Sequence, residues 1–146
     1  MIVAIGDNHI RLDKTLLLQS KSASLTTLIH PSAVISDYCK LGLGTVVMPQ
    51  AVINIDSQLG LACIVNTGAT VDHDCILDDG VHISPGANLA GGVAVKKCSW
   101  LGIGSAVCPG ITIGQNVIVG AGSVVINDIS NNQTVVGVPA RALHVV

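Results

Sequence analysis

Aliphatic residues recur at every sixth position of this chain from Ile35 to Val125. Sixteen consecutive positions of this series hold Ile, Leu or Val, and the register never slips. A period of six fits neither the helical period of about 3.6 residues nor the alternation of a half-buried strand. It is typical of a solenoid in which short strands are joined by corners and each repeat contributes one inward side chain. The pattern therefore predicts a parallel β-helix over residues 33–128.

The other positions of the six-residue block agree with this prediction. The first position is small or β-branched in every block, and three of the five cysteines fall there, at Cys39, Cys63 and Cys75. We interpret these cysteines as small buried residues without chemistry. Glycine follows the aliphatic residue at positions 42, 60, 102, 114 and 120, where we expect a tight corner with positive φ. Three blocks would complete one coil, which gives about five coils and a prism roughly 25 Å long.

The two flanks break the period. Residues 1–32 are predicted to form a βαβ unit, with strands at 2–5 and 25–29 and a helix that Asn8 caps and that runs to about Lys21. The apolar face of this helix would consist of Leu12, Leu16 and Leu17. No Gly-x-Gly-x-x-Gly motif precedes it, which excludes a complete dinucleotide-binding domain. The predicted segments are thus a βαβ unit at 1–32, a β-helix at 33–128 and a C-terminal cap at 129–146.

Composition narrows the classes of protein that fit. Hydrophobic residues make up 49% of the chain and charged residues 11%, which is unlike a disordered chain. The net charge of −2 excludes nucleic-acid binding through bulk positive charge. We expect no membrane insertion and no signal peptide, because no long unbroken apolar run is present and no basic segment opens the chain. The cysteines form no Cys-x-x-Cys pair, so we expect reduced thiols and a cytoplasmic protein.

Charged residues are absent from long stretches of the predicted prism. None occurs between Cys98 and Asn127, and only Asp56 occurs between Leu41 and Val71. Faces so poor in charge are expected to be buried against another protein surface. The distribution of charge therefore predicts a symmetric oligomer.

His73 is the first candidate for chemistry, at an expected corner of the prism. A step of one coil stacks Gly91 next to it. A histidine can take a proton from an amine or hydroxyl nucleophile, and the adjacent Asp74 carboxylate can hold its tautomer and raise its basicity. The backbone N–H of Gly91 can approach a tetrahedral oxyanion closely because no Cβ intervenes. Direct acyl transfer needs these parts and no nucleophilic Ser or Cys.

Asn66, Asp72 and His82 complete this local polar cluster, and the same step of one coil stacks Trp100 next to His82. The cluster also has a purely structural interpretation, in which the corner histidine is only hydrogen-bonded and the acidic segment is a solvated edge. Metal binding is the other alternative, because hexapeptide solenoids include a carbonic anhydrase class with zinc held by three histidines. Here only two histidines lie in the prism, with His30 at its start, and a catalytic zinc site commonly needs three protein ligands. We therefore expect no metal.

Several segments carry a more specific signal. In the repeat they are Asn66-Thr67, Val71-Asp72-His73-Asp74-Cys75, His82-Ile83-Ser84-Pro85-Gly86-Ala87 and Leu89-Ala90-Gly91-Gly92-Val93. In the flanks they are Gly6-Asp7-Asn8-x-x-Arg11, His30-Pro31-Ser32-Ala33 and Val136-Gly137-Val138-Pro139-Ala140. Together they resemble the bacterial sugar acetyltransferases of the left-handed β-helix class. These include sialic acid O-acetyltransferases and the UDP-4-amino-sugar N-acetyltransferases of the bacillosamine pathway.

The resemblance covers essentially the whole chain and implies a left-handed winding, a homotrimer and a role for individual residues. His73 would be the catalytic base, Asp74 would tune it, and the Gly91 backbone would contact the thioester carbonyl. The residues implied in binding acetyl-CoA are His82, Ile103, Ala121 and, by charge only, Arg141. Those implied in binding the acceptor sugar are Asn66 and, for a nucleotide sugar, Gly6.

These observations lead to one main hypothesis and two alternatives. The main hypothesis is a homotrimeric, acetyl-CoA-dependent acetyltransferase that acts on an amino or hydroxyl group of a sugar or nucleotide sugar, with three sites at the subunit boundaries. Members of the family usually carry a further segment before the position of Met1, with a glycine-rich loop for the nucleotide. The alternatives are a non-catalytic solenoid that serves as a scaffold or partner subunit, and a trimeric zinc enzyme of the carbonic anhydrase type.

Overall fold

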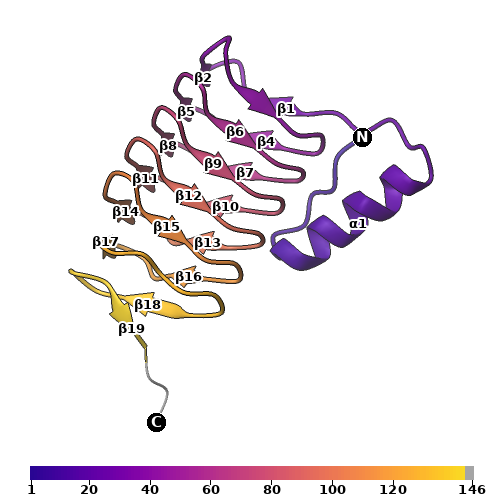
Figure 1. The fold of residues 1–146 in the computed structure, drawn as a ribbon. Helices are drawn as coiled ribbons and strands as arrows, with labels where there is room; N and C mark the ends of the chain where they lie inside the picture. The colour runs from indigo at the N-terminus through magenta and orange to yellow at the C-terminus, as the bar shows by residue number, and fades with distance from the viewer. Residues whose placement is uncertain (144–146) are drawn as a thin grey trace.

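The computed structural model describes residues 1–143, which form one α-helix and a stack of short β-strands. The strands build a solenoid of about six turns, whose chain passes through three parallel sheets in succession (Figure 1). We call these sheets faces A, B and C. Consecutive coils pair in register, so that Leu28 lies opposite Val46 and Val34 lies opposite Val52. This offset of one coil confirms the period predicted from the sequence.

Each face is a ladder of strands, most of which have two residues. Face A consists of β1 (Leu28–Ile29), β4 (Val46–Val47), β7 (Ile64–Val65), β10 (His82–Ile83), β13 (Trp100–Leu101), β16 (Ile118–Val119), β18 (Thr134–Val136) and β19 (Arg141–Ala142). Face B consists of β2 (Val34–Ile35), β5 (Val52–Ile53), β8 (Thr70–Val71), β11 (Asn88–Leu89), β14 (Ala106–Val107) and β17 (Val124–Val125). Face C consists of β3 (Lys40–Leu41), β6 (Gln58–Leu59), β9 (Ile76–Leu77), β12 (Ala94–Val95) and β15 (Thr112–Ile113).

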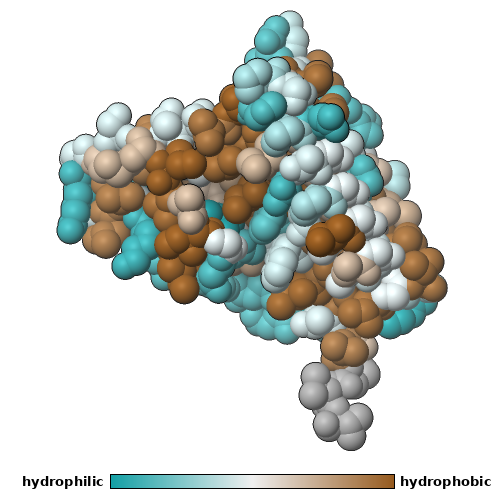
Figure 2. Space-filling model, turned by 180° about the vertical axis from the view of Figure 1, so that it is seen from behind, coloured by the Kyte–Doolittle hydropathy of each residue, from teal (hydrophilic) through white to brown (hydrophobic). Residues whose placement is uncertain are grey.

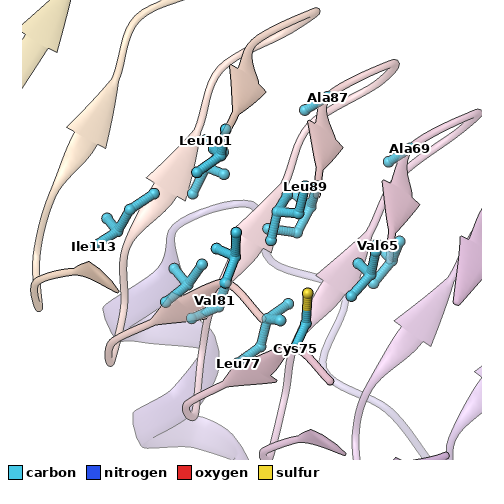
Figure 3. Close-up of a cluster of buried hydrophobic side chains, with 14 of the residues drawn as sticks. Val65, Ala69, Cys75, Leu77, Val81, Ala87, Leu89, Leu101 and Ile113 are labelled. Atoms are coloured by element: carbon cyan, nitrogen blue, oxygen red, sulfur yellow. The ribbon is translucent and has the colours of Figure 1, made fainter. Parts of the chain in front are cut away.

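The core is a column of small aliphatic side chains along the axis of the solenoid. Every predicted inward position from Val47 to Val125 is buried, whereas Ile35 and Leu41 in the first coil are only partly covered. Figure 3 shows this interior, with Val65, Leu77, Leu89, Leu101 and Ile113 among the labelled side chains. Cys63 and Cys75 are fully buried in the same column, and burial raises the pKa of the Cys63 thiol to about 12. These two cysteines act as small core residues, as predicted.

The five corner glycines do not have the positive φ expected from the sequence, so that prediction is wrong. Positive φ occurs two residues later in the block, as at Gly104 with φ of 64°, and not at Gly102. A Cβ atom at Gly102 would instead lie 2.6 Å from the carbonyl oxygen of Val119 and 2.7 Å from the amide nitrogen of Ala121. Glycine is therefore needed there because the backbone of the next coil passes too close for a side chain.

The βαβ unit predicted for residues 1–32 is not formed. Residues 2–5 contain no strand, and the strand at Leu28–Ile29 belongs to face A of the solenoid. The helix is present as α1 (Asn8–Ser20), but Asp7 is its N-cap, and the Asp7 carboxylate accepts a hydrogen bond from the backbone N–H of Ile10 at 2.9 Å. The solenoid thus begins before residue 33, and the N-terminal segment is a helix that lies beside it (Figure 1).

The face that α1 turns toward the solenoid differs from the predicted one. Leu12 is buried, but Leu16 and Leu17 are 40% and 45% exposed. The other buried residues of α1 are Asn8, Arg11 and Thr15. The outer side of the helix therefore keeps apolar side chains at the surface, and the view in Figure 2 contains several such apolar regions.

The C-terminal segment continues the solenoid further than predicted. Ile129 bridges to Ile113, and β18 extends face A in parallel with β16. Only β19 reverses direction and pairs antiparallel with β18, which closes the end of face A. Positions 144–146 of the predicted cap lie outside the described residues. Within residues 1–143, no helix combines the length and apolar character that crossing a membrane requires.

Candidate active site

The first group of candidate residues lies at the corner between faces B and C. Here the loop from β8 to β9 places Asp74 in the left-handed region with φ of 58°. In this conformation the Asp74 carboxylate lies 2.8 Å from Nδ1 of His73. The backbone N–H of His73 donates to the Asp72 carboxylate at 2.9 Å. The corner thus pairs the imidazole of His73 with Asp74, while Asp72 holds the backbone of the same residue.

This arrangement sets the tautomer and the basicity of His73. A carboxylate can only accept, so Nδ1 carries the hydrogen that is donated to Asp74, and Nε2 is left as the free basic nitrogen. The hydrogen bond that Nδ1–H donates to Asp74 raises the pKa of His73 above its usual range, and the negative charge of Asp72 raises it further. The His73 ring is more than half exposed, so it is accessible to a substrate.

Gly91 lies directly beside the ring of His73, as the step of one coil predicts. A Cβ atom at Gly91 would be 2.5 Å from Nε2 of His73, so any side chain there would displace the ring. The backbone N–H of Gly92 donates to the His73 carbonyl at 2.9 Å and fixes the two coils together. Within residues 1–143, the N–H of Gly91 itself has no hydrogen-bond acceptor. A free base and a free backbone donor therefore lie side by side.

The second group lies on face A and contains His82, Asn66 and Trp100. The Asn66 side-chain amide donates to Nε2 of His82 at 3.2 Å, while its oxygen accepts from the backbone N–H of Thr67 at 2.8 Å. The rings of His82 and Trp100 are stacked, with centroids 5.8 Å apart and an angle of 11° between their planes. Burial lowers the pKa of His82 to about 4, and the positive charge of Arg11 acts in the same direction. His82 is thus a neutral hydrogen-bonding group at physiological pH, not a base.

A cleft of about 500 Å³ lies between face A and the N-terminus of α1. It is lined by Gly6, Asp7, Asn8 and His9 from the N-terminal segment and by His82, Cys98, Trp100, Asn116 and Ile118 from the solenoid. The structure therefore brings the predicted acceptor residue Gly6 to the same cleft as His82. Sequence reasoning missed Ile118, although it lies one coil beyond Trp100 in the same column and the repeat could have identified it.

Arg11 fixes the rim of this cleft to the solenoid. Its guanidinium is buried and donates to the backbone carbonyls of Ile5, Gly6, Ala62 and Gly80 and to the side-chain oxygen of Asn8. These bonds use all five N–H donors of the side chain. Burial lowers the pKa of Arg11, and the converging carbonyl dipoles compensate its charge. The motif Gly6-Asp7-Asn8-x-x-Arg11 thus has a structural explanation.

The other predicted donor-binding residues lie near face A. Ile103 and Ala121 are exposed at the corner between faces A and B, one coil apart, and the N–H of Gly122 donates to the Ile103 carbonyl at 2.8 Å. Arg141 is exposed on β19, at the C-terminal end of face A. Its guanidinium contacts the carbonyl of Ala140 at 2.8 Å. Ile103 and Ala121 thus share one corner of the solenoid, and Arg141 lies at the C-terminal end of the adjoining face A.

The structure divides the predicted polar cluster into two parts. His82 lies on face A, whereas His73 lies at the corner between faces B and C, which does not border face A. The two histidines are nine residues apart in sequence, which is half a coil, so they point to different sides of the prism. A single chain therefore does not bring the proposed base and the proposed donor-binding histidine into one pocket. Among residues 1–143, no three His, Cys, Asp or Glu side chains lie close enough to hold a metal ion.

Comparison with solved structures identifies close relatives of this chain. The acetyltransferase domain of PglB from Neisseria gonorrhoeae is 44% identical, with a TM-score of 0.96, and the match covers 97% of this chain and 69% of that one. PerB from Caulobacter crescentus, solved with CoA and GDP-perosamine, is 46% identical with a TM-score of 0.96, over 98% and 69% of the two chains. WeeI from Acinetobacter baumannii is 28% identical with a TM-score of 0.92, over 97% and 69%.

Neither a family profile nor a curated protein sequence matches this chain. The likeness to PglB and PerB is nevertheless extensive in both sequence and structure, and it covers more than two thirds of each of those proteins. The same solenoid, helix and repeat described above account for the match. The chain therefore belongs to the hexapeptide-repeat β-helix sugar acetyltransferases.

Proposed function

We propose that this protein transfers the acetyl group of acetyl-CoA to an amino group of a nucleotide-linked sugar, with His73 as the general base. The observation that carries the proposal is the position of Nε2 of His73, which is the basic nitrogen of the neutral ring and lies against the backbone of Gly91. A base next to a free backbone donor suits the attack of a neutral nucleophile on a carbonyl group.

The reaction then follows from these groups in one direct transfer. The amine nitrogen of the acceptor attacks the thioester carbon while Nε2 of His73 takes a proton from that nitrogen. The oxyanion that forms accepts a hydrogen bond from the N–H of Gly91. Collapse of the intermediate breaks the C–S bond, and the leaving thiolate takes the proton back from the imidazolium. Asp74 stabilises the imidazolium during this cycle without itself changing protonation.

We place the acetyl donor along the corner between faces A and B. His82 and the backbone at Ile103 and Ala121 would bind the acetyl and pantetheine parts, and Arg141 would bind a CoA phosphate. Strands of face A are stacked about 4.8 Å apart, so the path from β10 to β19 is long enough for an extended pantetheine arm. PerB was solved with CoA, which supports a donor of this kind.

The acceptor is proposed to enter the cleft between α1 and face A, beside Gly6 and near Asn66, which is outside the cleft lining but bonds to His82 within it. PerB was solved with GDP-perosamine, an amino sugar linked to a nucleotide, and we take amino-sugar nucleotides as the first class to test. Sialic acids and the 4-amino sugars of bacillosamine synthesis are further candidates from the family resemblance. A mass spectrometric screen for a mass gain of one acetyl group would distinguish these acceptors.

We further propose a homotrimer with one active site at each boundary between neighbouring chains. The outward side chains of face B are Val34, Val52, Thr70, Asn88, Ala106 and Val124, and none is charged. An uncharged flat surface of this kind is suited to burial against another chain.

All five cysteines are free thiols, and this supports our proposal of a cytoplasmic location.

The first test measures donor binding and turnover separately. Calorimetric titration with acetyl-CoA should give about one site per chain, with weaker binding in His82→Ala. Replacement His73→Ala should leave donor binding intact and lower kcat by about 10²–10⁴-fold, the usual range for loss of a general base. His30→Ala is the matched control, because His30 is an exposed corner histidine outside the site, and it should keep full activity.

Three results would contradict the proposal. Full activity of His73→Ala would remove this residue from the role of base. Absence of acetyl-CoA binding up to millimolar concentration would instead favour the scaffold alternative, in which the solenoid is a partner subunit. Stoichiometric zinc in protein purified without chelator would favour the metal enzyme.

A further inference from the structure

Trp100 is an unusual residue in this chain, which has one Trp, one Tyr and no Phe. It lies on the outer side of β13 opposite His82 of β10, and its side chain is 47% exposed in the cleft. A large ring that is half exposed contributes less to stability than a buried one. Its position against His82 therefore calls for an explanation other than core packing.

The stacked pair is fixed by hydrogen bonds on both sides. Nε1 of Trp100 donates to the hydroxyl of Ser84, which is itself buried. Nε2 of His82 accepts from Asn66, whose amide orientation is set by its bond from Thr67. Each ring therefore has one defined orientation, and the nearly parallel planes keep the two in contact.

These contacts determine which part of His82 is available to a ligand. Because Nε2 accepts a hydrogen bond and the ring is neutral, the hydrogen must be on Nδ1. Within residues 1–143, the Nδ1–H of His82 has no acceptor, and His82 lines the cleft. A single N–H donor is therefore available to a bound molecule, and an uncharged acceptor such as a carbonyl oxygen fits it.

We propose that Trp100 is a positioning residue: it holds the ring of His82 so that Nδ1–H donates to the carbonyl oxygen of the bound acetyl donor. The inference rests on the proposed function, since it names the ligand atom. It goes beyond that function because it assigns to Trp100 a role that acts through His82. Asn66 and Trp100 hold the same ring from its edge and from its face.

The geometry of the pair can be tested without any ligand. Trp100 is the only tryptophan, so its fluorescence reports on this pair alone, and a protonated imidazole in contact with indole quenches its emission. We expect quenching with a midpoint near pH 4, the pKa of His82, and no such step in His82→Gln. Circular dichroism over the same range controls for unfolding. A midpoint near the usual pKa of about 6.5 would show that the ring is solvated rather than packed against the indole, and this would overturn the proposal.

The role in donor binding is tested by a double-mutant cycle. Trp100→Leu should raise the Kd for acetyl-CoA about five- to tenfold, the effect of one lost hydrogen bond, and Trp100→Phe should restore most of the affinity. In the His82→Gln background, Trp100→Leu should have almost no further effect, because it acts through His82. Tyr38→Leu, an exposed aromatic residue elsewhere, is the matched control and should bind normally.

The outcomes distinguish the inference from the function on which it rests. If Trp100→Leu raises the Kd for acetyl-CoA equally in the unmutated and the His82→Gln protein, the indole contacts the donor by itself. That result overturns the positioning role. If the unmutated protein fails to bind acetyl-CoA although the quenching midpoint stays near pH 4, the proposed function fails and the ligand role fails with it. Non-additive effects together with that midpoint support the proposal.

Discussion

Among single residues, Asp74 shows most clearly how local backbone conformation serves the site. Its φ of 58° lies in a region that most side chains avoid, and the corresponding residues of the next two coils are Gly92 and Gly110. Asp tolerates this region better than most residues other than Gly and Asn. In this conformation the Asp74 carboxylate lies 2.8 Å from Nδ1 of His73. The left-handed conformation of Asp74 therefore orients the imidazole of His73 and raises its pKa.

Replacement of Asp74 by Asn should shift the pH dependence of the reaction. Asn tolerates the same φ, but it removes the charge that raises the pKa of His73. Activity needs neutral His73, so the acidic limb of the kcat profile should move to lower pH, and kcat should fall roughly tenfold as the base weakens. The matched control is Asp56→Asn, which has φ of 61° at the same corner one coil earlier. An unchanged acidic limb would contradict the role of Asp74.

At the level of elements, the repeat was predictable from the sequence, but the packing of α1 was not. The inward positions follow from a strict period, because each short strand has only one side toward the axis. The helix was predicted to bury its leucines, yet Leu16 and Leu17 are exposed and Arg11 is buried in their place. A pattern of apolar residues cannot indicate that four backbone carbonyls converge on one guanidinium, since two of them, those of Ala62 and Gly80, come from distant parts of the chain.

Replacement of Arg11 by Met should therefore destabilise the packing of α1. It leaves the carbonyls of Ala62 and Gly80 without their donors in a buried place. We expect a loss of about 3 kcal/mol in the free energy of unfolding, since unsatisfied buried polar groups cost about 1–3 kcal/mol each. Lys14→Met, on the exposed side of the same helix, is the matched control and should change stability little. Thermal unfolding measures the stability of both variants. If Arg11→Met melts at the same temperature as the unmutated protein and the Lys14→Met control, the anchoring role is contradicted.

For the whole molecule, the local cluster predicted from the sequence joined residues that the structure places on two sides of the prism. Steps of one coil correctly stacked Gly91 on His73 and Trp100 on His82. The separation of nine residues between the two histidines was taken as closeness, whereas half a coil carries the chain to the other side of the prism. Two residues of a solenoid lie on the same side only when the number of residues between them is close to a whole number of coils. A short separation in sequence is not enough. The two halves of the proposed site can therefore meet only between neighbouring chains.

This conclusion predicts complementation between two defective chains. His73→Ala removes the base, and His82→Ala weakens donor binding, so each variant alone should be poorly active at low acetyl-CoA concentration. If the site takes His73 from one chain and His82 from its neighbour, random mixing at equal amounts leaves about one quarter of the boundaries intact. Coexpressed chains with different tags should then recover up to that share of the parental activity. Mixing His73→Ala with Gly91→Ser should recover none, because both changes affect the same corner. Recovery by neither mixture would mean that each chain carries its site alone, contrary to the separation of the two histidines on the prism.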